Sequence, residues 1–170
     1  MRKFKIDSDN KIRIWNWLQN NSIAHRGRFD GDKEKQLVGL VGESEFYKLL
    51  YGEYPEFKDG FDQGVDLVYK GKRIDVKTMG RNVVCTSSYV NNFLKCQLDY
   101  KCDIVVFISL NKKDNYFQVC GSLPKHLISE LGKFYPAGST RYRDDNTSFV
   151  VQEDMYEVSC KDLMRFSELV

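Results

Sequence analysis

The sequence predicts an α/β domain in which a central mixed β-sheet of about five strands is flanked by helices. Apolar residues recur at helical spacing over 33–51, and two short strands form a hairpin over 67–78. Residues 104–108 are an uninterrupted apolar run, which is typical of a strand buried on both faces of a sheet. The predicted order is helix, three strands, helix, two strands, or α-β-β-β-α-β-β.

The length of 170 residues suits one domain with its own hydrophobic core. With 42% hydrophobic and 29% charged residues, the composition is that of a globular protein and excludes a disordered chain. We predict an N-terminal arm or short helix in residues 1–32, a core in residues 33–122, and a C-terminal elaboration in residues 123–170.

The helix predicted over 33–51 carries one apolar face and ends at Gly52, a residue that favours helix C-termini. Gly39 and Gly42 lower its intrinsic helicity. We expect these two glycines to let the helix approach the sheet closely.

Strands and turns are predicted for the residues that follow. Residues 57–64 contain a first, irregular strand, and residues 67–69 and 73–78 pair as a hairpin through a tight Lys-Gly-Lys turn. A polar loop over 79–88 leads to a helix over 89–100, which places several apolar residues on one face.

The second half begins with the buried strand over 104–108, followed by a polar turn and a returning strand over 116–120. A helix opens at Ser122 or Leu123, with proline in its first turn, and stops at Gly132. A strand over 149–151 and a short helix over 160–167 complete the chain.

The hairpin contains the candidate catalytic residues. Successive side chains of a strand point to opposite faces, so Asp75 and Lys77 share one face while Ile74 and Val76 share the other. Asp66 lies at the start of the paired strand and can approach Asp75 across the hairpin. Two carboxylates and an ammonium group at one sheet edge suit metal-assisted hydrolysis of a phosphodiester, because carboxylates bind a hard cation and a fixed positive charge stabilises the transition state.

These residues give the chain a resemblance to the PD-(D/E)xK nuclease superfamily, which includes restriction enzymes, Holliday-junction resolvases and RecB-type nucleases. The matching pieces are Gly42-Glu43, Gly64-Val65-Asp66 and Asp75-Val76-Lys77. Val65 stands where the signature proline would be. The resemblance covers roughly residues 33–122 and implies a restriction-endonuclease-like core.

The resemblance also implies the roles of the site residues. Glu43, Asp66 and Asp75 would bind Mg²⁺, with Mn²⁺ able to substitute, and the carbonyl group of Val76 would be an additional ligand. Lys77 would assist the chemistry.

Glu45 competes with Glu43 for the role of the helix ligand. At roughly 100° per residue, Glu45 lies about 200° around the helix from Glu43, so the two cannot face the same site. We prefer Glu43 because it follows Gly42, as in the family pattern. The alternative is that Glu43 is a surface residue.

Five further residues are predicted to contact nucleic acid. Arg81 lies near the Lys77 end of the hairpin, and Gln97 and Tyr100 are similar to a Gln-x-x-x-Tyr motif that is one residue longer. Arg141 and Arg143 belong to a loop that combines basic, aromatic and hydroxyl side chains, which suits contacts with a nucleic-acid backbone. The alternative for Gln97 and Tyr100 is a position on the surface or at the edge of the core, and the alternative for Arg141 and Arg143 is an ordered surface loop.

The function predicted from these observations is a Mg²⁺-dependent nuclease that hydrolyses phosphodiester bonds in DNA. The alternatives are a non-catalytic nucleic-acid-binding module on the same fold, a nuclease for RNA or branched DNA junctions, and an unrelated interaction protein. Endo- or exonucleolytic action, sequence specificity and oligomeric state stay open, although a two-fold homodimer would suit cutting of both strands.

The net charge is only +2, which is compatible with acidic site residues that offset a basic rim.

The five cysteines contain no Cys-x-x-Cys pair, so we expect neither a structural zinc site nor a disulfide framework. Free thiols suit a reducing cytosol, and no signal peptide or bilayer-length apolar stretch is present, which predicts a cytoplasmic protein without membrane partners. The resemblance implies a phage, mobile-element or repair setting.

Overall fold

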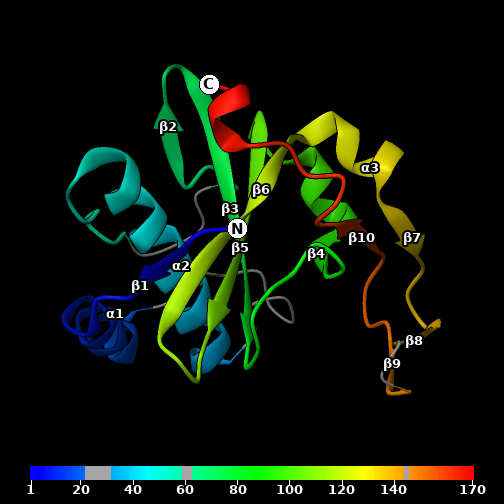
Figure 1. Ribbon diagram of the computed structural model, residues 1–170, viewed down its shortest axis with the longest axis horizontal. Coiled ribbons are helices and arrows are strands. Elements are labelled where there is room, and N and C mark those ends of the chain that lie inside the picture. Colours follow the sequence, from blue (N-terminus) through cyan, green and yellow to red (C-terminus); the bar gives the residue numbers. More distant parts are fainter. Residues whose placement is uncertain (22–31, 59–62, 144–145) are drawn as a thin grey trace.

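A mixed five-stranded sheet forms the centre of the computed structural model, which describes residues 1–21, 32–58, 63–143 and 146–170 (Figure 1). The strand order is β1-β6-β5-β3-β2. β3 and β5 are parallel and the other neighbours are antiparallel. The strands are β1 (Lys3–Lys5), β2 (Leu67–Tyr69), β3 (Lys72–Arg81), β5 (Ile104–Asn111) and β6 (Tyr116–Pro124). The expected mixed sheet is therefore confirmed.

Two different layers cover the faces of this sheet (Figure 1). Helices α1 (Ser8–Asn20) and α2 (Lys33–Tyr51) pack on one face. On the other face lies a three-stranded sheet made of β4 (Val90–Leu94), β10 (Met155–Ser159) and β7 (Lys133–Tyr135). A separate two-stranded sheet consists of β8 (Thr140–Tyr142) and β9 (Ser148–Val150).

Strand β5 separates the two hydrophobic clusters, and every one of its residues is buried. Val106 and Ile108 belong to the cluster beneath α2, whereas Val105 and Phe107 belong to the cluster beneath the three-stranded sheet. The continuous apolar run read from the sequence is explained by this double cover, because both faces of the strand are removed from water.

Capping residues and one close contact fix α2. Asp32 caps the N-terminus by accepting a hydrogen bond from the backbone N–H of Lys35 at 2.8 Å, and Gly52 ends the helix with a φ of 82°. A Cβ atom added at Gly42 would lie 2.0 Å from Oγ1 of Thr78 on β3, whereas one added at Gly39 would meet no atom within 4 Å. The prediction that α2 approaches the sheet closely is confirmed at Gly42. The same prediction is wrong at Gly39, where α2 has free space beside it.

A β-bulge interrupts the pairing of β5 with β6. Phe107 pairs with Gly121 and Ile108 pairs with Val119, so Cys120 is the additional residue. The additional residue changes which side chains of β6 point to which face of the sheet. Cys120 and Leu123 therefore pack into the same cluster although they are three residues apart.

The helix predicted over 89–100 is wrong. Its first half is strand β4, and its second half is a short 3₁₀ helix, η2 (Lys95–Asp99). Residues of β4 pair along their whole length with β10, from Leu94 opposite Met155 to Val90 opposite Ser159. This pairing with a distant segment overrides the helical spacing of the apolar residues.

The helix predicted to open at Ser122 is also shorter than expected. Strand β6 continues to Pro124, and only the 3₁₀ helix η3 (Lys125–Leu127) and the short α3 (Ile128–Leu131) follow. The predicted stop at Gly132 is confirmed, since Gly132 is the C-terminal cap of α3.

Other segments differ in smaller ways from the sequence-based expectations. Residues 57, 58, 63 and 64 are not in a strand, and the rest of the predicted first strand lies outside the described residues. The polar loop starts after β3, which extends to Arg81 because it pairs with β5 up to that residue. In place of a helix over 160–167, the C-terminal segment has the 3₁₀ helix η4 (Phe166–Glu168).

The predicted element order is reproduced along the chain only in outline. The strands expected over 67–69 and 73–78 are β2 and β3, whereas the described residues of the strand expected over 57–64 are not in a strand. β4 and η2 occupy the residues of the predicted helix, β4 belongs to the second sheet, and β5 and β6 follow as expected. The N-terminal β1 supplies the remaining strand of the first sheet. None of the described helices combines the length and apolar composition needed to cross a membrane.

The contact at Gly42 predicts a difference between two otherwise similar substitutions. Gly42→Ala places a methyl group against the stiff Thr78 side chain, and we expect it to lower the free energy of unfolding by about 1–3 kcal/mol. Gly39→Ala has free space and should raise it by about 0.5–1 kcal/mol. Urea unfolding followed by circular dichroism measures both, and equal midpoints would contradict the close packing of α2 on β3.

Candidate functional site

Asp75 and Lys77 form an ion pair on β3. Lys77 Nζ lies 2.7 Å from Asp75 Oδ1, and the side chain of Asp75 is only 1% exposed, compared with 21% for Lys77. In the parallel pairing, Asp75 lies beside Val105 and Lys77 beside Phe107, which both face the three-stranded sheet. The pair therefore occupies the sheet face opposite to α2.

Asp66 is fixed across the hairpin from this pair. Its backbone N–H donates to the carbonyl of Ile74 at 2.9 Å, and its Oδ2 accepts a hydrogen bond from the N–H of Val76 at 2.6 Å. The Asp66 carboxylate is thus held at the peptide bond between Asp75 and Val76. The side chain of Val76 is buried in the cluster on the α2 side.

The segment after η2 surrounds the same end of the hairpin. A Cβ atom at Gly64 would lie 2.3 Å from the ring of Tyr100, so this predicted site residue packs directly beside the Gly-Val-Asp segment. Lys125 Nζ donates a hydrogen bond to the carbonyl of Tyr100. Burial, and then the charge of Asp75, raise the pKa of the nearby Cys102 thiol to about 11, so this thiol stays protonated at neutral pH.

Glu43 lies on α2 and is half-buried. In the part of the chain that the structure describes, Glu43, Asp66 and Asp75 do not form a set of three metal-ligand atoms within 4.8 Å of one another. The structure therefore pairs Asp75 with Lys77 and holds Asp66 at the N–H of Val76, but it does not assemble the three acids into one set.

Glu45 has a structural role. It is 5% exposed, and its Oε1 accepts hydrogen bonds from Asn10 Nδ2 at 3.1 Å and from the Tyr54 hydroxyl at 3.2 Å. These contacts fix Glu45 between α1 and the segment after α2. The preference for Glu43 as the helix ligand stays a prediction, and Glu45 contributes to the packing of α1 and α2.

Most of the residues predicted to contact nucleic acid bind other groups of the protein instead. Arg81 Nη2 donates to the carbonyl of Val90 at 2.7 Å, and Gln97 is buried with its Oε1 accepting from the N–H of Leu94. Arg141 Nε lies 2.8 Å from Oε2 of Glu157. Arg143 is exposed, with its guanidinium 4.8 Å from the centre of the Phe149 ring.

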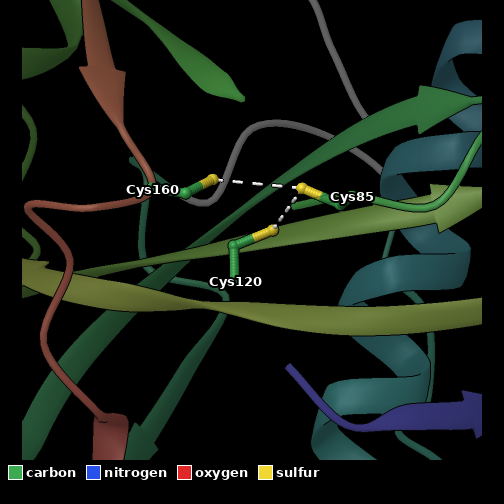
Figure 2. Close-up of side chains that lie close together, drawn as sticks. All are labelled: Cys85, Cys120 and Cys160. Carbon is green, nitrogen blue, oxygen red and sulfur yellow. Dashed lines mark hydrogen bonds between the residues drawn. The ribbon is translucent and has the colours of Figure 1, made fainter. Parts of the chain in front are cut away.

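A cluster of three thiols was missed by the sequence reasoning. The sulfur atoms of Cys85, Cys120 and Cys160 lie within 4.8 Å of one another and all three residues are buried (Figure 2). Hydrogen bonds from the other two thiols lower the pKa of Cys85 to about 3. The absence of a Cys-x-x-Cys pair predicts that there is no structural zinc site, but that argument does not apply to ligands from three distant segments.

Comparison of the chain with models of protein families, with curated proteins and with solved structures returned no match. The relation to the PD-(D/E)xK nucleases is therefore a resemblance carried by short motifs. The geometry of Asp66, Asp75 and Lys77 is the observation from which a function is proposed below.

The burial of the Asp75–Lys77 pair predicts a large effect of removing its cation. Lys77→Met keeps the side-chain length but leaves the Asp75 carboxylate without its ammonium partner, and we expect a loss of about 3 kcal/mol in the free energy of unfolding. The matched control is Lys35→Met, because the Lys35–Asp32 pair is exposed and should contribute less than about 0.5 kcal/mol. Urea unfolding of both variants at neutral pH is the measurement. Similar small losses in both would contradict a buried, charged Asp75.

Proposed function

We propose that the protein is a metal-dependent nuclease that hydrolyses phosphodiester bonds, with DNA as its substrate. The observation that supports this proposal is the buried Asp75–Lys77 pair, together with the Asp66 carboxylate that is held at the N–H of the intervening Val76. Charged groups are costly to bury, and such arrangements occur preferentially at functional sites. The resemblance to the PD-(D/E)xK motif supports the same reaction.

The residues present fit a hard divalent cation. Asp66 and Asp75 offer carboxylate oxygens, and an ionised carboxylate has about four acceptor positions. Mg²⁺ commonly keeps several water molecules and binds only one or two carboxylates, so these two acids suffice without Glu43. The carbonyl of Val76 is the additional ligand in this proposal, and Mn²⁺ would substitute. When bound, the metal would polarise the phosphate and activate water.

Lys77 supplies a fixed positive charge in this arrangement. The contact with Asp75 holds its ammonium group in place before substrate binds. A charge that is already oriented can stabilise the negative charge that develops on the phosphate oxygens at no further cost of reorganisation. The hydrogen bond from Val76 likewise fixes the Asp66 carboxylate.

One observation favours a second candidate, a non-catalytic nucleic-acid-binding module. Among the described residues, the three acids of the motif do not converge within 4.8 Å. A chain that has kept the fold but not the full ligand set would bind nucleic acid without cutting it. The exposed Arg143 beside Phe149 would serve either candidate.

Cleavage assays decide between these candidates. The protein is incubated with plasmid DNA, single-stranded DNA, RNA and a four-way DNA junction, in Mg²⁺, in Mn²⁺ or in a chelator. We expect metal-dependent cleavage that falls by at least ~100-fold in Asp66→Asn and in Asp75→Asn. Asn at position 66 can still accept the hydrogen bond from Val76, so the fold should persist. Asp114→Asn is the control, because this exposed carboxylate lies in the turn between β5 and β6.

Each result has a distinct meaning. Unchanged cleavage in both variants, or cleavage that persists in chelator, would contradict the proposed site. Binding of a nucleic acid without cutting of any substrate would favour the binding module. Cleavage restricted to RNA or to the junction would keep the chemistry and change the substrate.

A further inference from the structure

The three thiols are positioned by three separate parts of the fold. The sulfur of Cys85 is 3.7 Å from that of Cys120 and 3.9 Å from that of Cys160, as the dashed lines in Figure 2 show. The exposed fractions are 3%, 9% and 7% respectively. In a tetrahedral zinc site, Zn–S bonds of about 2.3 Å place neighbouring sulfurs about 3.8 Å apart. The two separations from Cys85 match this spacing, and the sulfurs of Cys120 and Cys160 lie within 4.8 Å of each other.

Separate backbone contacts fix each of the three cysteines. The Gln118 side chain fixes the backbone of Cys85 by accepting from its N–H at 2.9 Å and donating to its carbonyl at 3.2 Å. Cys120 is the additional residue of the β6 bulge, which aims its side chain into this cluster. Cys160 follows β10 and donates its N–H to the carbonyl of Tyr89 at 2.9 Å.

Polar groups around the sulfurs suit an anionic thiolate set. Asn91 Nδ2 donates to the sulfur of Cys160 at 3.2 Å, and Asn91 is fully buried. Asn91 Oδ1 has no hydrogen-bond partner among the residues that the structure describes. Arg81, at the end of β3, is close enough to act electrostatically on Cys85. Three thiolates and one divalent cation carry a net charge of −1, which this guanidinium would offset.

We propose that Cys85, Cys120 and Cys160 bind one Zn²⁺ ion as thiolates. Thiolate ligands select Zn²⁺ over the hard ions Mg²⁺ and Mn²⁺, so this site is distinct from the carboxylate site of the proposed nuclease. Asn91 donates a hydrogen bond to a ligand sulfur in this site, as outer-shell partners do. Each protonated thiol releases its proton to solvent on binding, and no oxidant or reductant takes part.

The bound ion would tie together three parts of the chain. Cys120 belongs to the five-stranded sheet, Cys160 immediately follows the three-stranded sheet, and Cys85 lies in the segment between β3 and β4. Zn²⁺ would therefore stabilise the packing of one sheet on the other.

The test uses the full chain, reduced and freed of metal by a chelator. Co²⁺ alone is titrated first, and we expect one equivalent to give the intense sulfur-to-cobalt charge-transfer band and the visible bands of tetrahedral Co²⁺. Zn²⁺ should abolish both bands and raise the unfolding temperature, since it binds the folded chain preferentially. Competition with a chromophoric chelator then gives the affinity for Zn²⁺.

Matched cysteine variants locate the site. Cys85→Ser and Cys120→Ser should weaken Zn²⁺ binding by more than ~100-fold, and Asn91→Ala by about tenfold. Cys96→Ser and Cys102→Ser are the controls, because Cys96 is exposed and Cys102 is buried outside the cluster. Both should bind Zn²⁺ as the unmodified chain does.

Three outcomes would overturn the proposal. They are the absence of the charge-transfer band in the reduced, unmodified chain, an equal Zn²⁺ affinity of cluster and control variants, and a disulfide between two of the three cysteines in protein kept under reducing conditions. The spectrum of the unmodified chain decides the question even where a serine variant fails to fold. None of these readouts depends on nuclease activity.

Discussion

The parallel pairing of β3 with β5 is the interaction on which the rest of the structure depends. It runs from Ile74 opposite Ile104 to Arg81 opposite Asn111 and places β3 beside β5, which is buried along its whole length, inside the sheet. Both faces of β5 must be removed from water, so the chain needs a cover on each side. The helices cover one face and the three-stranded sheet covers the other.

The different covers of the two sheet faces determine where polar and reactive side chains can lie. On β3, the residues facing α2 are apolar or small, and Gly42 lets the helix lie directly against Thr78. The opposite face carries Asp75 and Lys77, and further along the strand it reaches Arg81, beside the thiol cluster. The cover on this side is made of short strands and turns rather than a helix, which leaves polar and sulfur-containing groups at the contact between the two sheets.

Local signals were sufficient to predict much of the fold from the sequence. The hairpin, the end of α2 at Gly52, and the apolar run of β5 each depend on residues that are close in the chain. Strand β4 could not be predicted, because its conformation is imposed by β10, more than fifty residues later in the sequence. The ion pair on β3 follows from strand alternation, whereas the grouping of Cys85, Cys120 and Cys160 depends on a bulge and on the packing of two sheets, for which the spacing of the cysteines gives no signal.

The bulge at Cys120 also has a consequence for how the length of this chain can vary. Beyond it, Ser122 exchanges backbone hydrogen bonds with Met164, and a Cβ atom at Gly121 would lie 2.6 Å from Cβ of Leu163. The second half of β6 is therefore in register with the C-terminal segment, while its first half is in register with β1. Removing one residue between Val119 and Ser122 would reverse which side chains meet that segment. A change of length is therefore not expected in this stretch of β6.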